Sequence, residues 1–523
     1  MTSSDSPVFE STASTGKLFI VFFSIAAVAY VVVLGGISHG QLLYGVPTYE
    51  DDYRTLAYSL GNIPIIACRP IAFYTSFLMG SFGATFTYLC AQVMAVATIA
   101  LSFTLVACYL EVKRLYWPSV LVALVSAVSV ENLADYSRYL AGLFGLYSSV
   151  LGLTALICFV RAFRADRPQK FLMPAIVLTV LGLLCKEEFF GPIICFCLWS
   201  SLPVFGEKNR HLARITAISL ICVCAAILAF EKFILHSPFL GSGVAYSISW
   251  SPASILGAYW SYLTNCPGTK IAAAANISAI LFSIVMCGRQ TTIRVTAIAA
   301  LSLLIMAPFS LIPQHFLEIY TFEWTSLQCA SLLVLCCIDK TKLRHQTQTS
   351  VKTPLSVQAL LCVFLLALIP AIIFVTNPLR VAKFAWHDKR GAFNSKVIAW
   401  LSAHRNELNK HKLVAVTGLP LGSPWYGNDG AFLKNKLGLN CSWLVVTPKN
   451  SDLYKAQLAC AALKCGSIEV KAIDAAALES GEPEAVSVVP ELKGRGIPLI
   501  HVKEDGTVDF KSNLAEDMND AKN

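Results

Sequence analysis

Long apolar runs constrain this chain more than any other feature. A helix needs roughly 20 apolar residues to cross the hydrocarbon core of a bilayer. Only 14% of the 523 residues are charged, whereas a soluble chain would carry about 25%, and the mean hydropathy is +0.61. The sequence therefore predicts an α-helical polytopic membrane protein. Its eleven expected spans lie near residues 18–37, 86–110, 118–133, 139–160, 171–186, 189–205, 215–235, 271–287, 295–312, 323–338 and 355–375.

The end of the chain differs in composition from the rest. Residues 1–376 hold 22 Lys and Arg with 16 Asp and Glu, whereas the shorter segment 377–523 holds 19 and 16. Residues 391–408 have the apolar spacing of a surface helix, and short β-like runs with one helical stretch between them follow. We therefore expect a membrane domain over 1–376 and a small soluble α/β domain over 377–523.

The distribution of Lys and Arg between loops predicts the orientation. With eleven spans and a cytoplasmic N-terminus, the inner loops carry fifteen Lys and Arg and the outer loops six. Because positive residues favour the cytoplasmic side, we expect the C-terminal domain outside the cytoplasm. The predicted orientation depends on how residues 70–85 are interpreted, because they are apolar enough to be a further span. Gly80 and Gly83 interrupt them, so we interpret the segment as a re-entrant or interfacial helix.

Most polar residues near the predicted outer face fall into a few short segments. The first outer loop carries Glu50, Asp51 and Asp52 in a row, and Arg69-Pro70 follows. Charge beside a bilayer is costly unless it is used or solvated. These acids are therefore candidates for a functional site, and the alternative is that they lie in a solvated loop. The other segments carry Glu131, Asp135, Tyr136, Arg138, Lys186, Glu187, His315 and Tyr320.

The order of these elements resembles the GT-C superfamily of integral membrane glycosyltransferases, in the style of the protein O-mannosyltransferases and the aminoarabinose transferase of lipid A. One span precedes the acidic loop, and Arg69-Pro70 precedes a partly amphipathic segment. Lys113-Arg114 forms a basic inner turn. Tyr136-Ser137-Arg138-Tyr139 opens the fourth span, Lys186-Glu187 closes the fifth, and His315 and Tyr320 come late. The resemblance covers roughly residues 18–340.

The resemblance implies transfer of a hexose or pentose from a polyprenyl-phosphate carrier to a glycan, lipid or protein acceptor, with inversion at the anomeric carbon. It implies that Asp51 or Asp52 is the general base, with a slight preference for Asp52. The resemblance makes Arg69, Arg138, Lys186 and His315 candidates to bind the leaving phosphate, with Tyr320 as a hydrogen-bond donor. Glu50 completes the substrate-binding set.

Structural alternatives stay open for several of these residues. Arg138 could anchor a span end, His315 could be a polar loop residue, and Lys186 could serve only to pair with Glu187 or Glu188. Glu131 and Asp135 could cap helices. Three adjacent acids could hold a divalent cation, although nothing else resembles a metal site. The positive charges are spread through loops, so no nucleic-acid partner is expected.

Two other functions compete with transfer. A transporter or flippase would also place charges within a bundle, but such folds commonly repeat a half with broken helices, and no repeat is visible. An O-antigen polymerase or ligase would need a large late outer loop with arginines, and the loop at 313–320 has none. A non-catalytic assembly protein is a third alternative. The compact loops favour a bacterial inner membrane.

Overall fold

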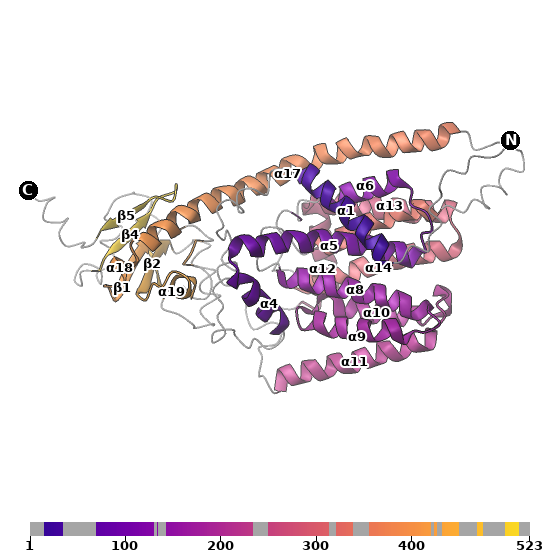
Figure 1. Ribbon diagram of the computed structural model, residues 1–523, viewed down its shortest axis with the longest axis horizontal. Coiled ribbons are helices and arrows are strands. Elements are labelled where there is room, and N and C mark those ends of the chain that lie inside the picture. The colour runs from indigo at the N-terminus through magenta and orange to yellow at the C-terminus, as the bar shows by residue number, and fades with distance from the viewer. Residues whose placement is uncertain are drawn as a thin grey trace, which may run out of the picture.

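The computed structural model describes residues 15–34, 70–129, 133, 143–233, 249–312, 321–337, 355–419, 423–425, 431–448, 468–473 and 497–511. A bundle of helices is followed by one very long helix that leads to a small sheet (Figure 1). The bundle elements are α1 (Thr15–Leu34), α4 (Pro70–Ser81), α5 (Ala84–Leu110), α6 (Trp117–Val128), α8 (Leu143–Arg164), α9 (Gln169–Leu183), η2 (Glu187–Phe189), α10 (Phe190–Ser200), η3 (Pro203–Phe205), α11 (Arg210–Phe233), α12 (Pro252–Asn265), α13 (Pro267–Met286), α14 (Arg289–Ser310), α15 (Phe322–Ala330) and η6 (Ser331–Cys337).

The helices define the class of protein. Seven described helices are long and apolar enough to cross a bilayer, namely α1, α5, α8, α11, α13, α14 and the first part of α17 (Leu355–Ala403). Predicted spans 3, 5, 6 and 10 correspond to shorter apolar helical segments. The protein is thus an α-helical polytopic membrane protein with a small C-terminal sheet region. The total of eleven spans stays a prediction.

Helix α5 forms the centre of the bundle. It packs against α1, α8 and α15, and most of its length is buried. Its end is set by Glu111, which adopts a left-handed conformation at φ 57° and returns its backbone N–H to the last turn. Non-glycine residues seldom adopt this conformation. The Glu111 side chain is held by arginines of two other helices, α8 and α14, and these contacts offset the cost.

Helix α4 covers most of the segment that we interpreted as re-entrant or interfacial. It ends at Ser81, and Gly83 at φ 94° precedes α5. Positive φ is the conformation that glycine tolerates best. With 12 residues, α4 is about 18 Å long, too short to cross a bilayer. The Thr87 hydroxyl donates to the Met79 carbonyl at 3.1 Å, and this bond folds α4 back against α5.

Helix α17 joins the bundle to the C-terminal sheet. It is continuous over 49 residues, about 74 Å, and the domain boundary expected after residue 376 falls inside it. Only its first part, Cys362–Leu379, has the composition of a span. Figure 1 shows it running from the bundle to the sheet.

The C-terminal region has the predicted α/β character. It contains α18 (Arg405–Leu408), β1 (Leu413–Thr417), α19 (Ala431–Asn435), β2 (Ser442–Pro448), β3 (Ile468–Ile473), β4 (Leu499–Val502) and β5 (Val508–Lys511). The strand order is β3-β2-β1-β4-β5, and only β5 is antiparallel to its neighbour. Its core packs Val397 and Leu401 of α17 against Trp425 and Trp443.

A residue of the bundle belongs to this second core. Tyr88, one turn into α5, is fully buried and lies in the same hydrophobic cluster as Val416, Trp425 and Val502. The sheet is therefore docked on the end of the bundle at which α5 begins. We refer to this end as the domain end, and to the end with Glu111 as the opposite end.

Candidate functional site

Several elements that are distant in sequence meet at the domain end of the bundle. The Tyr147 hydroxyl, near the start of α8, contacts Met79 Sδ of α4 at 3.1 Å. The element η2 packs on the same helix α8 and also contacts α14. Gly152 makes this close approach possible, because a Cβ at this position would overlap the ring of Phe189.

Lys186 lies in this assembly, in the turn between α9 and η2. Its ammonium group forms an ion pair with Glu188, and it lies 5.0 Å from the centroid of the Phe309 ring at the end of α14. The Lys186 side chain is 13% exposed and that of Glu188 is 3% exposed. A partly desolvated ammonium over a ring face gains more cation–π energy than an exposed one. The main chain is fixed as well, because the Ser148 hydroxyl donates to the Lys186 carbonyl at 2.8 Å.

The adjacent serine holds a second buried acid. Ser149 donates a 2.6 Å hydrogen bond to Glu323 Oε1, and Glu323 is only 1% exposed. Glu323 lies in the first turn of α15, where the helix dipole favours a negative charge. Sequence reasoning did not select this residue. A signal existed, because Glu323 is the only acid in the predicted span 323–338, and an acid within a span is a functional-site candidate.

The opposite end carries a different set of charges. Arg164 binds Glu207 through two hydrogen bonds of 2.7 Å, and also donates to the carbonyls of Cys108 and Tyr109. Arg294 pairs with Glu111 at 2.9 Å. This network joins α5, α8 and α14 to the segment before α11.

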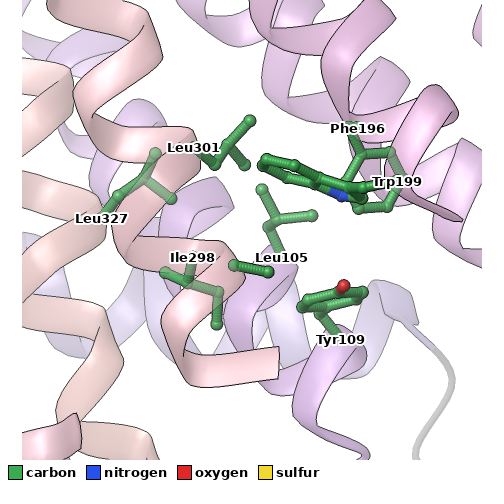
Figure 2. A pocket seen from close by; sticks show the side chains of 8 residues that line it. Leu105, Tyr109, Phe196, Trp199, Ile298, Leu301 and Leu327 are labelled. Atoms are coloured by element: carbon green, nitrogen blue, oxygen red, sulfur yellow. The ribbon is translucent and has the colours of Figure 1, made fainter. Parts of the chain in front are cut away.

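A small pocket lies inside the bundle between α5, α10, α14 and α15 (Figure 2). Its lining consists of Leu105, Tyr109, Phe196, Trp199, Ala297, Ile298, Leu301 and Leu327. Aliphatic and aromatic carbon dominates this lining, so the pocket offers little to a charged or polyhydroxyl substrate. We therefore place the candidate site at the domain end.

Lys186 is the one predicted site residue that the structure describes. The other predicted residues, Glu50, Asp51, Asp52, Arg69, Arg138, His315 and Tyr320, lie outside the described residues, as do Glu131 and Asp135. Of the alternatives for Lys186, pairing with Glu188 is present. Within the described ranges, no group of three His, Cys, Asp or Glu side chains is placed to hold a metal ion.

Comparison with known proteins gives limited similarity. No protein-family model matches the chain, and no curated protein matches it. Among solved structures, ArnT from Cupriavidus metallidurans in the apo state is similar with a TM-score of 0.45 and 11% identity. The same protein bound to undecaprenyl phosphate gives a TM-score of 0.40 and 11% identity. Each match covers 94% of this chain and 93% of the other. Neither assigns a role to any residue here.

Proposed function

We propose that this protein is a membrane glycosyltransferase that moves a sugar from a polyprenyl-phosphate carrier to an acceptor hydroxyl at the domain end of the bundle. The observation that carries the proposal is the fixed ammonium group of Lys186 at this end, little exposed and held by Glu188 and the Phe309 ring. The order of the sequence elements from the acidic loop onward supports the same class. The competing transporter class has no comparable support in the described residues.

The chemistry divides into two halves. As the acceptor hydroxyl attacks the anomeric carbon, Asp51 or Asp52 takes its proton, and attack opposite the leaving group inverts the sugar. The bond between the anomeric carbon and the phosphate oxygen breaks, and negative charge grows on the departing lipid phosphate. Lys186 stabilises that charge, because a cation fixed in a dry site need not reorganise during the reaction. Arg69, Arg138, His315 and Tyr320 are the further proposed donors, and Glu50 completes the substrate-binding set.

Location follows from the same proposal. We propose that the domain end lies outside the cytoplasm, because Lys and Arg are concentrated in the loops of the other side, and that the membrane is a bacterial inner membrane. The acceptor and the sugar then meet at the outer face. A reporter fused after residue 376 that is active only in the cytoplasm would contradict this orientation.

The test of the proposal uses Lys186 and a matched control. The full chain is purified in nanodiscs, binding of undecaprenyl phosphate is measured, and surface glycans and glycolipids of a deletion strain are compared by mass spectrometry. We expect Lys186→Ala to reduce transfer by about 10²-fold or more, the size reported for losing one fixed donor to a developing anion. Lys208→Ala is the control, because Lys208 pairs with Asp166 on the surface at the opposite end. Its transfer should equal that of wild type.

Two results would end the proposal. One is a deletion strain whose surface glycans and glycolipids are unchanged. The other is a Lys186→Ala protein that folds, binds undecaprenyl phosphate and transfers sugar as wild type does, since the observation that carries the proposal would then have no functional consequence.

A further inference from the structure

The C-terminal sheet has a topological switch point. From β1 the chain proceeds to β2 and β3 on one side, and then returns to the other side of β1 as β4. Strands β1 and β4 are parallel neighbours that lead in opposite directions across the sheet. In open α/β sheets, ligands bind outside the carboxyl ends of the strands at this position.

The carboxyl ends of these strands are turned toward the bundle. The turn that follows β4 packs on α17, since a Cβ on Gly506 would meet the Phe393 backbone and Lys396 Nζ donates to the Asp505 carbonyl at 2.9 Å. Tyr88 of α5 lies in the same hydrophobic cluster as Val416 and Val502, which stand near the carboxyl ends of β1 and β4. Because β1 is parallel to β4, Thr417 at its end lies at the same edge as β4's last residues.

Two polar side chains meet at this edge. The Thr417 hydroxyl and His501 Nδ1 are 2.9 Å apart, across β1 and β4. His501 is exposed. The backbone after Thr417 runs close to β4. Gly418 permits this approach, because it has φ +76° and a Cβ there would overlap the Val502 carbonyl. The pair is therefore fixed in position, with the imidazole presented to solvent.

The segment that follows β1 adds two buried polar atoms. Ser423 Oγ and Trp425 Nε1 have no hydrogen-bond partner among the residues that the structure describes, although Ser423 is fully buried and Trp425 nearly so. Buried polar groups in native proteins are nearly always satisfied. Within the described residues, two unsatisfied polar groups therefore lie in the segment that follows the carboxyl end of β1.

The charges at the edge indicate a neutral ligand. Among the described residues, Lys396 and Lys503 contact the turn after β4 or its flanking strand, and both are engaged, Lys396 with the Asp505 carbonyl and Lys503 with Asp509 at 3.0 Å. A phosphate would favour an unengaged Arg or Lys, whereas hydroxyl, imidazole and indole groups suit sugar hydroxyls. An occupant that lies between the sheet and the membrane bundle is most simply the head group of a membrane lipid.

We infer that Thr417 and His501 form an acceptor subsite that binds the sugar head group of a glycolipid at the switch point of the C-terminal sheet. This inference rests on the proposed transfer function. The subsite binds the head group above the outer end of the bundle, while the lipid tail stays in the bilayer. Thr417 acts as a positioning residue that sets the ring of His501, and His501 Nε2 meets the ligand.

The experiment separates ligand binding from a structural role of the Thr417–His501 bond. His501→Asn places a polar nitrogen near the Nδ1 position and so retains the bond to Thr417, whereas His501→Gln places one near the Nε2 position. The full chain with each variant is assayed for sugar transfer in membranes of the deletion strain and for undecaprenyl phosphate binding. His501→Asn should lose about tenfold in transfer, the size expected for one lost hydrogen bond, and His501→Gln should lose less. Undecaprenyl phosphate binding should be unchanged in both.

A direct readout accompanies the transfer assay. The wild-type chain is placed in nanodiscs of phosphatidylethanolamine and phosphatidylglycerol, with or without total glycolipid from the deletion strain. Carbethoxylation of His501 by diethyl pyrocarbonate is then followed by mass spectrometry. Glycolipid should slow modification of His501 and leave that of His404 unchanged.

The outcomes distinguish this inference from the proposed function. If His501→Asn transfers as wild type does, or if glycolipid gives His501 no protection, the subsite is wrong while the transferase proposal stands. If the wild-type protein does not bind undecaprenyl phosphate and the deletion strain keeps unchanged surface glycans, the transferase proposal fails. Protection of His501 by glycolipid then decides whether the sheet binds a sugar head group.

Discussion

The two ends of the bundle both bury charge, yet they arrange it differently. At the opposite end, Arg164 directs its guanidinium fork at Glu207 and at two main-chain carbonyls. At the domain end, the compact ammonium of Lys186 pairs with Glu188 and lies over the Phe309 ring. A planar fork suits bidentate pairing with a carboxylate, whereas an ammonium is a compact point charge. We call the Arg164–Glu207 pair the latch and assign it a structural role. The ammonium of Lys186 is suited to stabilising an anion that forms during the reaction.

The largest effect is expected from breaking the latch. Glu207→Gln removes the charge that compensates the Arg164 guanidinium, and removal of one partner of a buried pair costs about 3–5 kcal/mol. The measurement is the free energy of unfolding of the detergent-solubilised protein. Transfer per folded molecule should be unchanged, because Glu207 lies at the opposite end.

A double variant sharpens this test. Arg164→Met combined with Glu207→Leu removes both charges, so it should recover part of the stability lost in Glu207→Gln. If Glu207→Gln leaves the unfolding free energy unchanged, or if it lowers transfer per folded molecule, the separation between a structural and a functional end is wrong.

The second prediction concerns the acidic loop, where a substitution should lower activity and leave stability unchanged. Replacing Asp51 or Asp52 by Asn keeps the side-chain size and removes basicity. Transfer should fall by about 10²-fold or more in the variant that lacks the base, in line with the contribution of a positioned general base. Initial rates in deletion-strain membranes provide the measurement, and unfolding of the same preparations provides the control.

Glu50→Gln is the matched variant for this loop, because we expect its side chain to point away from the base. It should reduce transfer less than the Asp variants do. Wild-type transfer in Asp51→Asn, Asp52→Asn and the double variant would exclude the proposed mechanism.

Local sequence patterns predicted much of the architecture. Every predicted span within the described ranges contains a helix. A membrane span can be recognised from the composition of its own residues, without knowledge of its tertiary contacts. The α/β character of the tail was likewise visible from short β-branched runs. One local stop signal does not end its helix. Asn377-Pro378 was taken as the start of the tail, yet α17 passes through both Pro370 and Pro378.

The site was less predictable, since it depends on contacts between distant segments. Lys186 was a candidate from its place at a span end, but its neighbours Phe309 and Ser148 come from other helices. The latch between Arg164 and Glu207 was not predicted, because Arg164 was interpreted only as one of many inner-loop cations. The pairing of Thr417 with His501 requires the strand order, which short β-like runs do not specify.

The smallest effect concerns the two adjacent serines of α8, of which Ser148 donates to the Lys186 carbonyl and Ser149 donates to the Glu323 carboxylate. Ser149→Ala removes the 2.6 Å donor to the Glu323 carboxylate, and loss of a hydrogen bond to a charged group costs about 1.5–3 kcal/mol. Ser302→Ala is the matched control, because Ser302 is also buried but donates to a carbonyl of its own helix, that of Ala299. Unfolding of both variants under identical conditions gives the comparison, and Ser149→Thr should restore most of the loss because it keeps the hydroxyl. If Ser302→Ala is as destabilising as Ser149→Ala, the bond to Glu323 adds nothing to helix packing at the domain end.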